Sequence, residues 1–159
     1  AARCETQEVV LYRLWPDKRV MFVASIEFVA EHSQAIWSEA LARRGAAEST
    51  AEAVLDYESD HLGEFGLYRI LFAGLSETDD RVIRNALRAA YRSFHRFIQA
   101  RVEEHRNSRD GRKLPPPPLV AWALIGLGTA INVGRELDLL PAQARRELLA
   151  TVGRHLLGS

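Results

Sequence analysis

Cysteine, lysine and long apolar runs are the features that this sequence has least of. Cys4 is the single cysteine among 159 residues, which excludes an internal disulfide and a Cys-rich zinc site. No run of about 18 apolar residues occurs, and the first residues lack the basic-then-apolar pattern of a signal peptide. Two Lys against nineteen Arg, with abundant Ala and Leu, are typical of GC-rich bacterial genomes. We therefore expect a soluble, cytoplasmic bacterial protein.

Charge of either sign is not in excess, because 21 basic and 21 acidic residues give a formal net charge of zero. Such a chain has no overall electrostatic footprint for nucleic acid, so any contact with DNA must come from a local patch. Strict alternation of apolar and polar residues, the pattern of a half-buried strand, is not sustained anywhere. Apolar residues instead recur at helical spacing, and we expect an all-α, multi-helix bundle.

Helix start and stop signals divide this pattern into six segments. Asp17 is a plausible N-cap, and Ser49 with Glu52 has the S-x-x-E form of a capping box. Gly63 and Gly66 weaken a helix, so we expect a kink or short break there. The expected helices cover residues 17–43, 50–62, 64–75, 78–105, 119–137 and 141–157.

Two further signals organise the second half of the chain. Asp79 and Asp80 are expected in the first turn of the helix over 78–105, where carboxylates suit the positive end of the helix dipole. Residues 107–118 contain Gly111 and four consecutive prolines, which cannot continue a helix. This segment is expected to be a surface crossover that leads into the next helix.

The segment 119–137 is apolar nearly all round, as in a helix that is central in a large core or covered by another subunit. Gly126, Ala130 and Gly134 recur four residues apart and would let a partner helix approach closely. We expect residues 119–157 to form half of a four-helix homodimer interface; an internal helical hairpin of a monomer is the alternative. The predicted interface residues are Leu127, Ile131, Leu148, Val152 and Leu156.

The stretch LYRLWPDK at residues 11–18 carries a family resemblance. Its Leu11, Tyr12, Trp15, Pro16 and Lys18 resemble the end of the DNA-binding region of tetracycline-repressor (TetR) family regulators. In that family the recognition helix closes with a Leu-Tyr-x-x-aromatic signature, and the next helix begins at the lysine. The rest of the chain is similar to the family's C-terminal region in helix order, loop position and length.

The resemblance implies two parts: residues 1–16 as the remnant of a helix-turn-helix domain, and residues 17–159 as an effector-binding and dimerisation domain. It also implies that DNA is contacted by Thr6, Gln7, Tyr12, Arg13 and Lys18. The family's first helix and most of its second would precede residue 1. Because a recognition helix needs that platform, we expect this stretch of chain not to bind an operator unaided.

Aromatic residues spread over several segments suggest a ligand pocket. They fall on or beside inward-facing positions, together with a few polar groups, and a mostly apolar cavity with placed polar groups suits a small molecule. A plain aromatic core is the alternative. With the resemblance, we predict a repressor whose helical domain binds a small apolar or aromatic effector. The predicted pocket residues are Trp37, Tyr57, His61, Phe65, Tyr68, Phe72, Tyr91, Phe94, Phe97, Trp122, Thr129 and Asn132.

Two other classes of function stay open. One is a constitutive dimerisation module that binds no ligand. The other is a di-metal helical-bundle oxidase, because Glu58 and His61 have the Glu-x-x-His spacing of di-iron proteins; a second copy of that motif is lacking. No nucleophile lies in a recognisable frame. We therefore expect no enzyme activity, catalytic residue, metal or cofactor, and no membrane partner.

Overall fold

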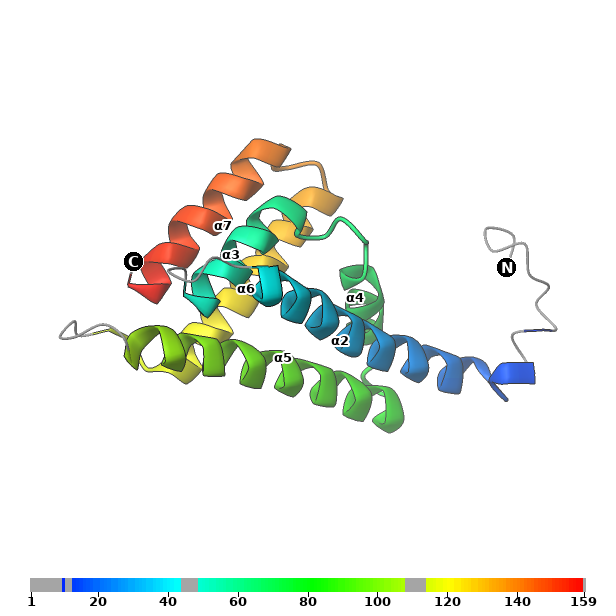
Figure 1. Ribbon diagram of the computed structural model, residues 1–159. Coiled ribbons are helices and arrows are strands. Elements are labelled where there is room, and N and C mark those ends of the chain that lie inside the picture. The colour runs from blue at the N-terminus through cyan, green and yellow to red at the C-terminus, as the bar shows by residue number, and fades with distance from the viewer. Residues whose placement is uncertain (1–9, 11–12, 44–48, 108–113, 159) are drawn as a thin grey trace.

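The computed structural model describes residues 10, 13–43, 49–107 and 114–158, and every element in this part of the chain is helical. The prediction of an all-α bundle is confirmed. The helices are α2 (Lys18–Arg43), α3 (Thr50–His61), α4 (Tyr68–Ser76), α5 (Arg81–Asn107), α6 (Pro117–Glu136) and α7 (Ala142–Leu157). The two longest, α2 and α5, lie side by side, and the others stack above them (Figure 1).

Side-chain caps begin the first helices where the sequence predicts them. The carboxylate of Asp17 accepts a hydrogen bond from the Val20 amide at 2.8 Å, and the Ser49 hydroxyl accepts one from the Glu52 amide at 3.1 Å. Each cap satisfies a first-turn N–H that has no partner within the helix.

The start of α5 differs from the prediction. The helix begins at Arg81, so Asp79 and Asp80 precede its first turn. The Asp80 carboxylate accepts from the Val82 amide at 2.7 Å. Asp80 therefore caps α5, because its carboxylate satisfies first-turn N–H groups that have no partner within the helix.

The break between α3 and α4 is longer than expected. A helix was predicted from residue 64, but α4 begins at Tyr68. Gly63 and Gly66 have φ of +75° and +66°, a left-handed conformation that cannot lie inside an α-helix. The two glycines therefore make a turn that redirects the chain, and this turn borders the cavity described below.

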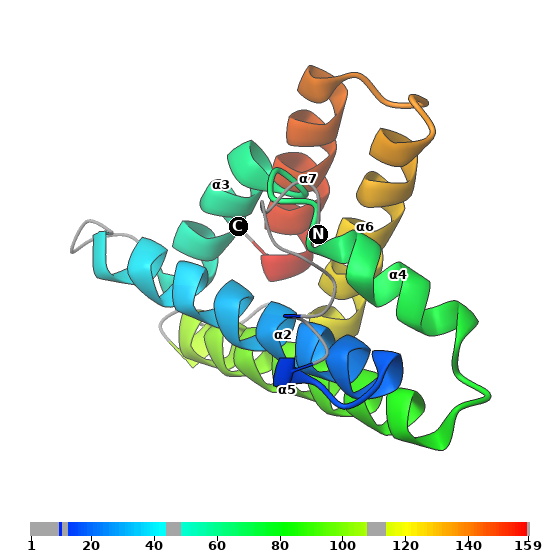
Figure 2. The same ribbon diagram turned by 90° about the vertical axis from the view of Figure 1, so that its right-hand side faces the viewer.

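Two hydrophobic clusters share α5. The first joins α2, α4 and the N-terminal half of α5 around Ile26, Leu71 and Leu87. The second joins α3, α6 and α7 with the C-terminal half of α5 around Val102 and Ile131. In Figure 2, α6 and α7 form an antiparallel pair, and α7 lies between α6 and α3. The bundle thus has two cores and one helix that serves both.

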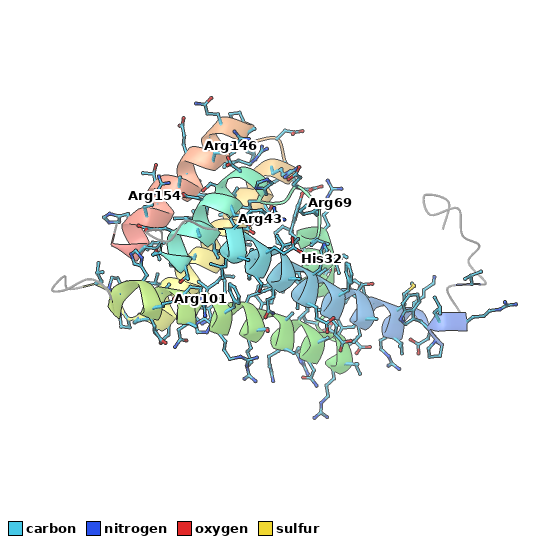
Figure 3. All side chains as sticks on the ribbon, in the orientation of Figure 1. His32, Arg43, Arg69, Arg101, Arg146 and Arg154 are labelled. Carbon is cyan, nitrogen blue, oxygen red and sulfur yellow. The ribbon has the colours of Figure 1, made fainter. Side chains whose placement is uncertain are left out.

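Close packing and surface ion pairs join α3 to α7. A Cβ atom at Gly153 would lie 2.4 Å from the Leu55 Cδ1, so the missing side chain lets α7 approach α3. Arg146 and Arg154, labelled on α7 in Figure 3, pair with Asp60 and Asp56 of α3 at 3.5 and 2.5 Å. Such exposed pairs contribute about 1 kcal/mol or less each; the packing is the stronger tie.

The outer face of α6 is apolar and uncovered within one chain. By length and composition α6 could cross a membrane, and no other described helix could; its inner face nevertheless packs on α5 and α7. Small residues occupy the middle of the outer face, and large ones its ends. The exposed residues of this α6 outer face are Leu119, Trp122, Ala123, Gly126, Ala130, Val133 and Leu137.

The register of α6 differs from the predicted interface. Ile131 is 1% exposed and lies inside the second core, so it cannot contact a partner. Leu127, Leu148 and Leu156 pack partly buried against that core, and Val152 is exposed.

The predicted small-residue ridge is also only partly on the surface. Gly126 and Ala130 are exposed. Gly134 is buried, and a Cβ atom there would lie 2.6 Å from the Leu140 Cδ1. The surface that a partner could reach is therefore the α6 outer face and Val152.

Replacing Ser49 by Ala should destabilise the fold by about 1 kcal/mol. Its hydroxyl caps α3 and also lies 2.7 Å from Nδ1 of the buried His105. Urea denaturation followed by circular dichroism measures the change. Ser38→Ala is the matched control, because Ser38 is exposed within α2 and bonds only the Gln34 carbonyl. Equal stability of the two variants would contradict the capping role.

Candidate functional site

A cavity of about 230 Å³ lies where the two cores meet. Val29 and Phe94 reach it from the first core, and Leu55 and Val102 reach it from the second. All six helices contribute to its wall. The volume is close to the lower end of about 300–1,000 Å³ for small-molecule sites, so a compact one- or two-ring compound suits it.

Aromatic rings from α2 and α5 form one side of the cavity. The Trp37 ring centroid lies 5.6 Å from Phe94, edge to face, and 5.1 Å from Phe97. Tyr91 meets Phe94 edge to face at 6.2 Å. Burial raises the pKa of the Tyr91 phenol, which keeps that side chain neutral. The rings present both faces and edges to a ligand.

Glu58 places a carboxyl group in this largely apolar wall. Trp37 donates its indole N–H to Glu58 Oε1 at 2.5 Å, and no described residue donates to Oε2. Burial raises the pKa of Glu58, although the Trp37 hydrogen bond and the nearby His61 act in the opposite direction. The protein thus holds a carboxyl group where ionisation is costly, with one oxygen unused.

Asn132 of α6 carries a second acceptor without a partner. Its side chain is 7% exposed and borders the cavity, and its Oδ1 has no hydrogen-bond partner. A Cβ atom at Gly63 would lie 2.3 Å from this oxygen. Glycine at the turn therefore makes room for the Asn132 amide. A buried acceptor without a donor costs free energy, about 1–3 kcal/mol.

Two cavity-lining residues at the end of α3 and in the turn after it are exposed to solvent. His61 stacks on Tyr57 with ring centroids 4.3 Å apart, and its Nδ1 donates to the Tyr57 carbonyl at 2.9 Å. His61 and Phe65 border the cavity and are exposed to solvent.

Arg101 borders the cavity from α5, the helix on which Figure 3 labels it. Its guanidinium lies over the Phe97 ring at 5.6 Å and pairs with Glu104 at 3.5 Å. Its Nε is buried and has no hydrogen-bond partner.

The structure brings eleven of the twelve predicted pocket residues to this one cavity. Trp122 is the exception: it lies on the α6 outer face, 49% exposed, with its ring 5.0 Å from His95. Glu58 and Arg101 were not among the predicted pocket residues. The Glu58–Trp37 hydrogen bond identifies the first, and no sequence pattern brings those two residues together.

The predicted DNA-contacting residues fall mostly outside the described part of the chain. Thr6, Gln7 and Tyr12 are not described. Arg13 and Lys18 are exposed, and Lys18 is the first residue of α2, where the resemblance expects the next helix to begin.

The Glu58-x-x-His61 motif does not gather further metal-binding groups. Glu58 binds Trp37, and His61 stacks on Tyr57. Among the described residues, no group of three His, Cys, Asp or Glu side chains could hold a metal ion.

Comparison with protein-family models, with curated proteins and with solved structures gave no significant match to this chain. The cavity and the surfaces around it are therefore interpreted from their own geometry.

Glu58→Gln should raise the stability of the fold at neutral pH by an amount on the order of 1 kcal/mol. The folded-state pKa of Glu58 lies above its ordinary value of 4.5, so the folded protein binds the proton more tightly than the unfolded chain. Stability from this group is then present below pH 4.5 and is lost as the pH rises through the folded value. Glutamine keeps the acceptor for Trp37 and cannot ionise.

Thermal unfolding from pH 4 to pH 8 measures the difference between Glu58→Gln and wild type. The difference should be small at pH 4 and grow toward pH 8. Glu64→Gln, at an exposed carboxylate outside this cavity, is the control and should stay parallel to wild type. A constant difference across the range would show that ionisation of Glu58 does not oppose folding.

Proposed function

We propose that this chain is the effector-binding and dimerisation part of a TetR-like, cytoplasmic transcriptional repressor. The observation that carries the proposal is the aromatic cavity whose wall includes Trp37 of α2, because α2 begins at the LYRLWPDK corner. Ligand binding would displace α2, and α2 would reposition the recognition helix of each subunit. In a dimer the distance between two recognition helices decides whether both reach half-sites about one turn of DNA apart.

The proposed dimer forms through the α6 outer face. Its large residues at the ends, Leu119 and Leu137, are 60% and 61% exposed, and its small residues in the middle permit close helix approach. An exposed apolar patch of this kind marks an interaction site in a soluble protein. A second copy supplies the complementary face by two-fold symmetry, because the same patch serves on both subunits.

A constitutive dimerisation module is the second candidate, and the same α6 outer face favours it. It predicts the same dimer and no ligand response. The free oxygen of Glu58 in the cavity wall argues for a ligand instead.

The repressor function is tested with the protein in its full encoded length. We expect selection from random duplex DNA to yield an operator, and compact aromatic compounds to lower affinity for it. The Gly128→Leu variant should still bind the operator but should no longer respond to the ligand. Gly128 borders the cavity, and a Cβ atom placed there would lie 3.9 Å from its nearest side-chain neighbour. Gly128→Ala is the control and should respond like wild type. Ligand binding without any effect on the operator would refute the switch.

Ala130→Asp should convert the dimer to a monomer with unchanged helix content. The substitution places a charge in the middle of the α6 outer face, where burial against a partner is costly. Light scattering coupled to gel filtration measures the mass. Ala89→Asp is the matched control, because Ala89 is an exposed alanine of α5 away from this face. A monomeric wild type would contradict the dimer, and a wild type that partitions into lipid vesicles would assign the face to a membrane.

A further inference from the structure

We propose that the cavity binds a compact aromatic cation, an amine whose ammonium group pairs with Glu58 while its ring packs among the aromatic side chains. The inference rests on the proposed function, because it names the chemical class of that effector. It is carried by the free oxygen of Glu58, by the position of charged groups around the cavity, and by the arrangement of the rings.

One side-chain oxygen on α3 and one on α6 have no hydrogen-bond donor among the described residues. Glu58 Oε2 receives no hydrogen bond from a described residue, and neither does Asn132 Oδ1. Both residues border the cavity, one from α3 and the other from α6, but the Asn132 oxygen is fully buried, so Glu58 Oε2 is the acceptor that a ligand can reach. A carboxylate accepts hydrogen bonds and donates none. A ligand that carries an N–H group satisfies Glu58 Oε2, whereas an acceptor-only ligand leaves it unsatisfied.

The charges around Glu58 favour a cationic donor over a neutral one. No described basic side chain lies within ion-pairing distance of Glu58; Arg101 pairs instead with Glu104 at 3.5 Å. The exposed His61 acts on Glu58 only electrostatically, and Tyr57 beside it is a neutral phenol whose pKa burial raises further. An ammonium group therefore brings the missing counter-charge, and an anionic ligand would add to the negative charge.

The aromatic rings supply the rest of the binding energy. The indole of Trp37 donates to Glu58, so its ring lies directly beside the carboxyl group, with Phe97 at 5.1 Å and Phe94 at 5.6 Å. A cation near aromatic faces is stabilised by their negative charge density. The same rings pack against the apolar body of the ligand, so charge and ring are recognised next to each other.

Pairing of Glu58 with the ligand also affects the hydrogen bond that joins α3 to α2. Glu58 holds Trp37 of α2 through one oxygen, and an ammonium group on the other oxygen keeps the carboxyl group ionised. An ionised acceptor strengthens the Trp37 hydrogen bond, so a cation changes the tie between α2 and α3 and a neutral ligand does not. The charge of the effector would thus be part of the signal.

Calorimetric titration with three isosteric probes tests the inference: 3-phenylpropylamine, 3-phenylpropan-1-ol and n-butylbenzene. They have the same number of non-hydrogen atoms and differ in charge and in hydrogen-bond donors. We expect the protonated amine to bind about tenfold or more tightly than the alcohol, and the alcohol more tightly than the hydrocarbon. Glu58→Gln should lower the affinity for the amine to that for the alcohol, and Glu64→Gln should leave the order of the three affinities unchanged.

The outcomes separate this inference from the proposed function. Equal affinities for the three probes, or the highest affinity for the hydrocarbon, would overturn the proposal of a cationic ligand. A ligand-binding cavity would remain. An amine preference that persists in Glu58→Gln would overturn the role of that carboxylate. If no probe binds wild type at millimolar concentration, and the Gly128→Leu variant behaves identically, both the cation and the ligand-binding function are overturned.

Discussion

The length of α5 is the constraint on which both the fold and the cavity depend. Its 27 residues extend about 40 Å at 1.5 Å per residue, and two separate clusters of side chains cover its two halves. Its N-terminal half packs with α2 and α4 around Leu87, and its C-terminal half packs with α3, α6 and α7 around Val102. Phe97 and Ile98 lie between these sites and border the cavity. The cavity is the space that remains where two cores share one helix.

Local signals in the sequence account for most helix boundaries. Helical periodicity and capping side chains act within one turn of chain, so Asp17 and Ser49 could be recognised without tertiary structure. The start of α4 depends on the backbone of Gly63 and Gly66, whose left-handed conformation permits no helix between them. The register of α6 could not be predicted either. A helix that is apolar nearly all round does not indicate which side faces the core, and only packing places Ile131 inside.

The cavity was predictable to the extent that inward-facing aromatic residues indicate it. Amphipathic helices such as α5 place Tyr91, Phe94 and Phe97 toward the interior, and all three border the cavity. Trp122 belongs to α6. Because α6 has no polar face, its sequence does not indicate whether Trp122 lies on the inner or the outer side. Glu58 was attributed only to a metal motif because a carboxylate in a helix ordinarily faces solvent. Its position in the cavity follows from the contact with Trp37, a residue 21 positions away.

The shared use of α6 connects the cavity to the proposed dimer. Asn132 faces the cavity, while its neighbours Ala130 and Val133 lie on the α6 outer face. A ligand that packs against α6 in the cavity therefore acts on the helix that a second subunit would contact, and a ligand that binds Glu58 acts on Trp37 of α2. A ligand can shift an equilibrium only through different affinities for two states. On the proposed function, the two states differ in how α2 lies against α3, so an effector that binds Glu58 and packs against α6 is the kind that distinguishes them.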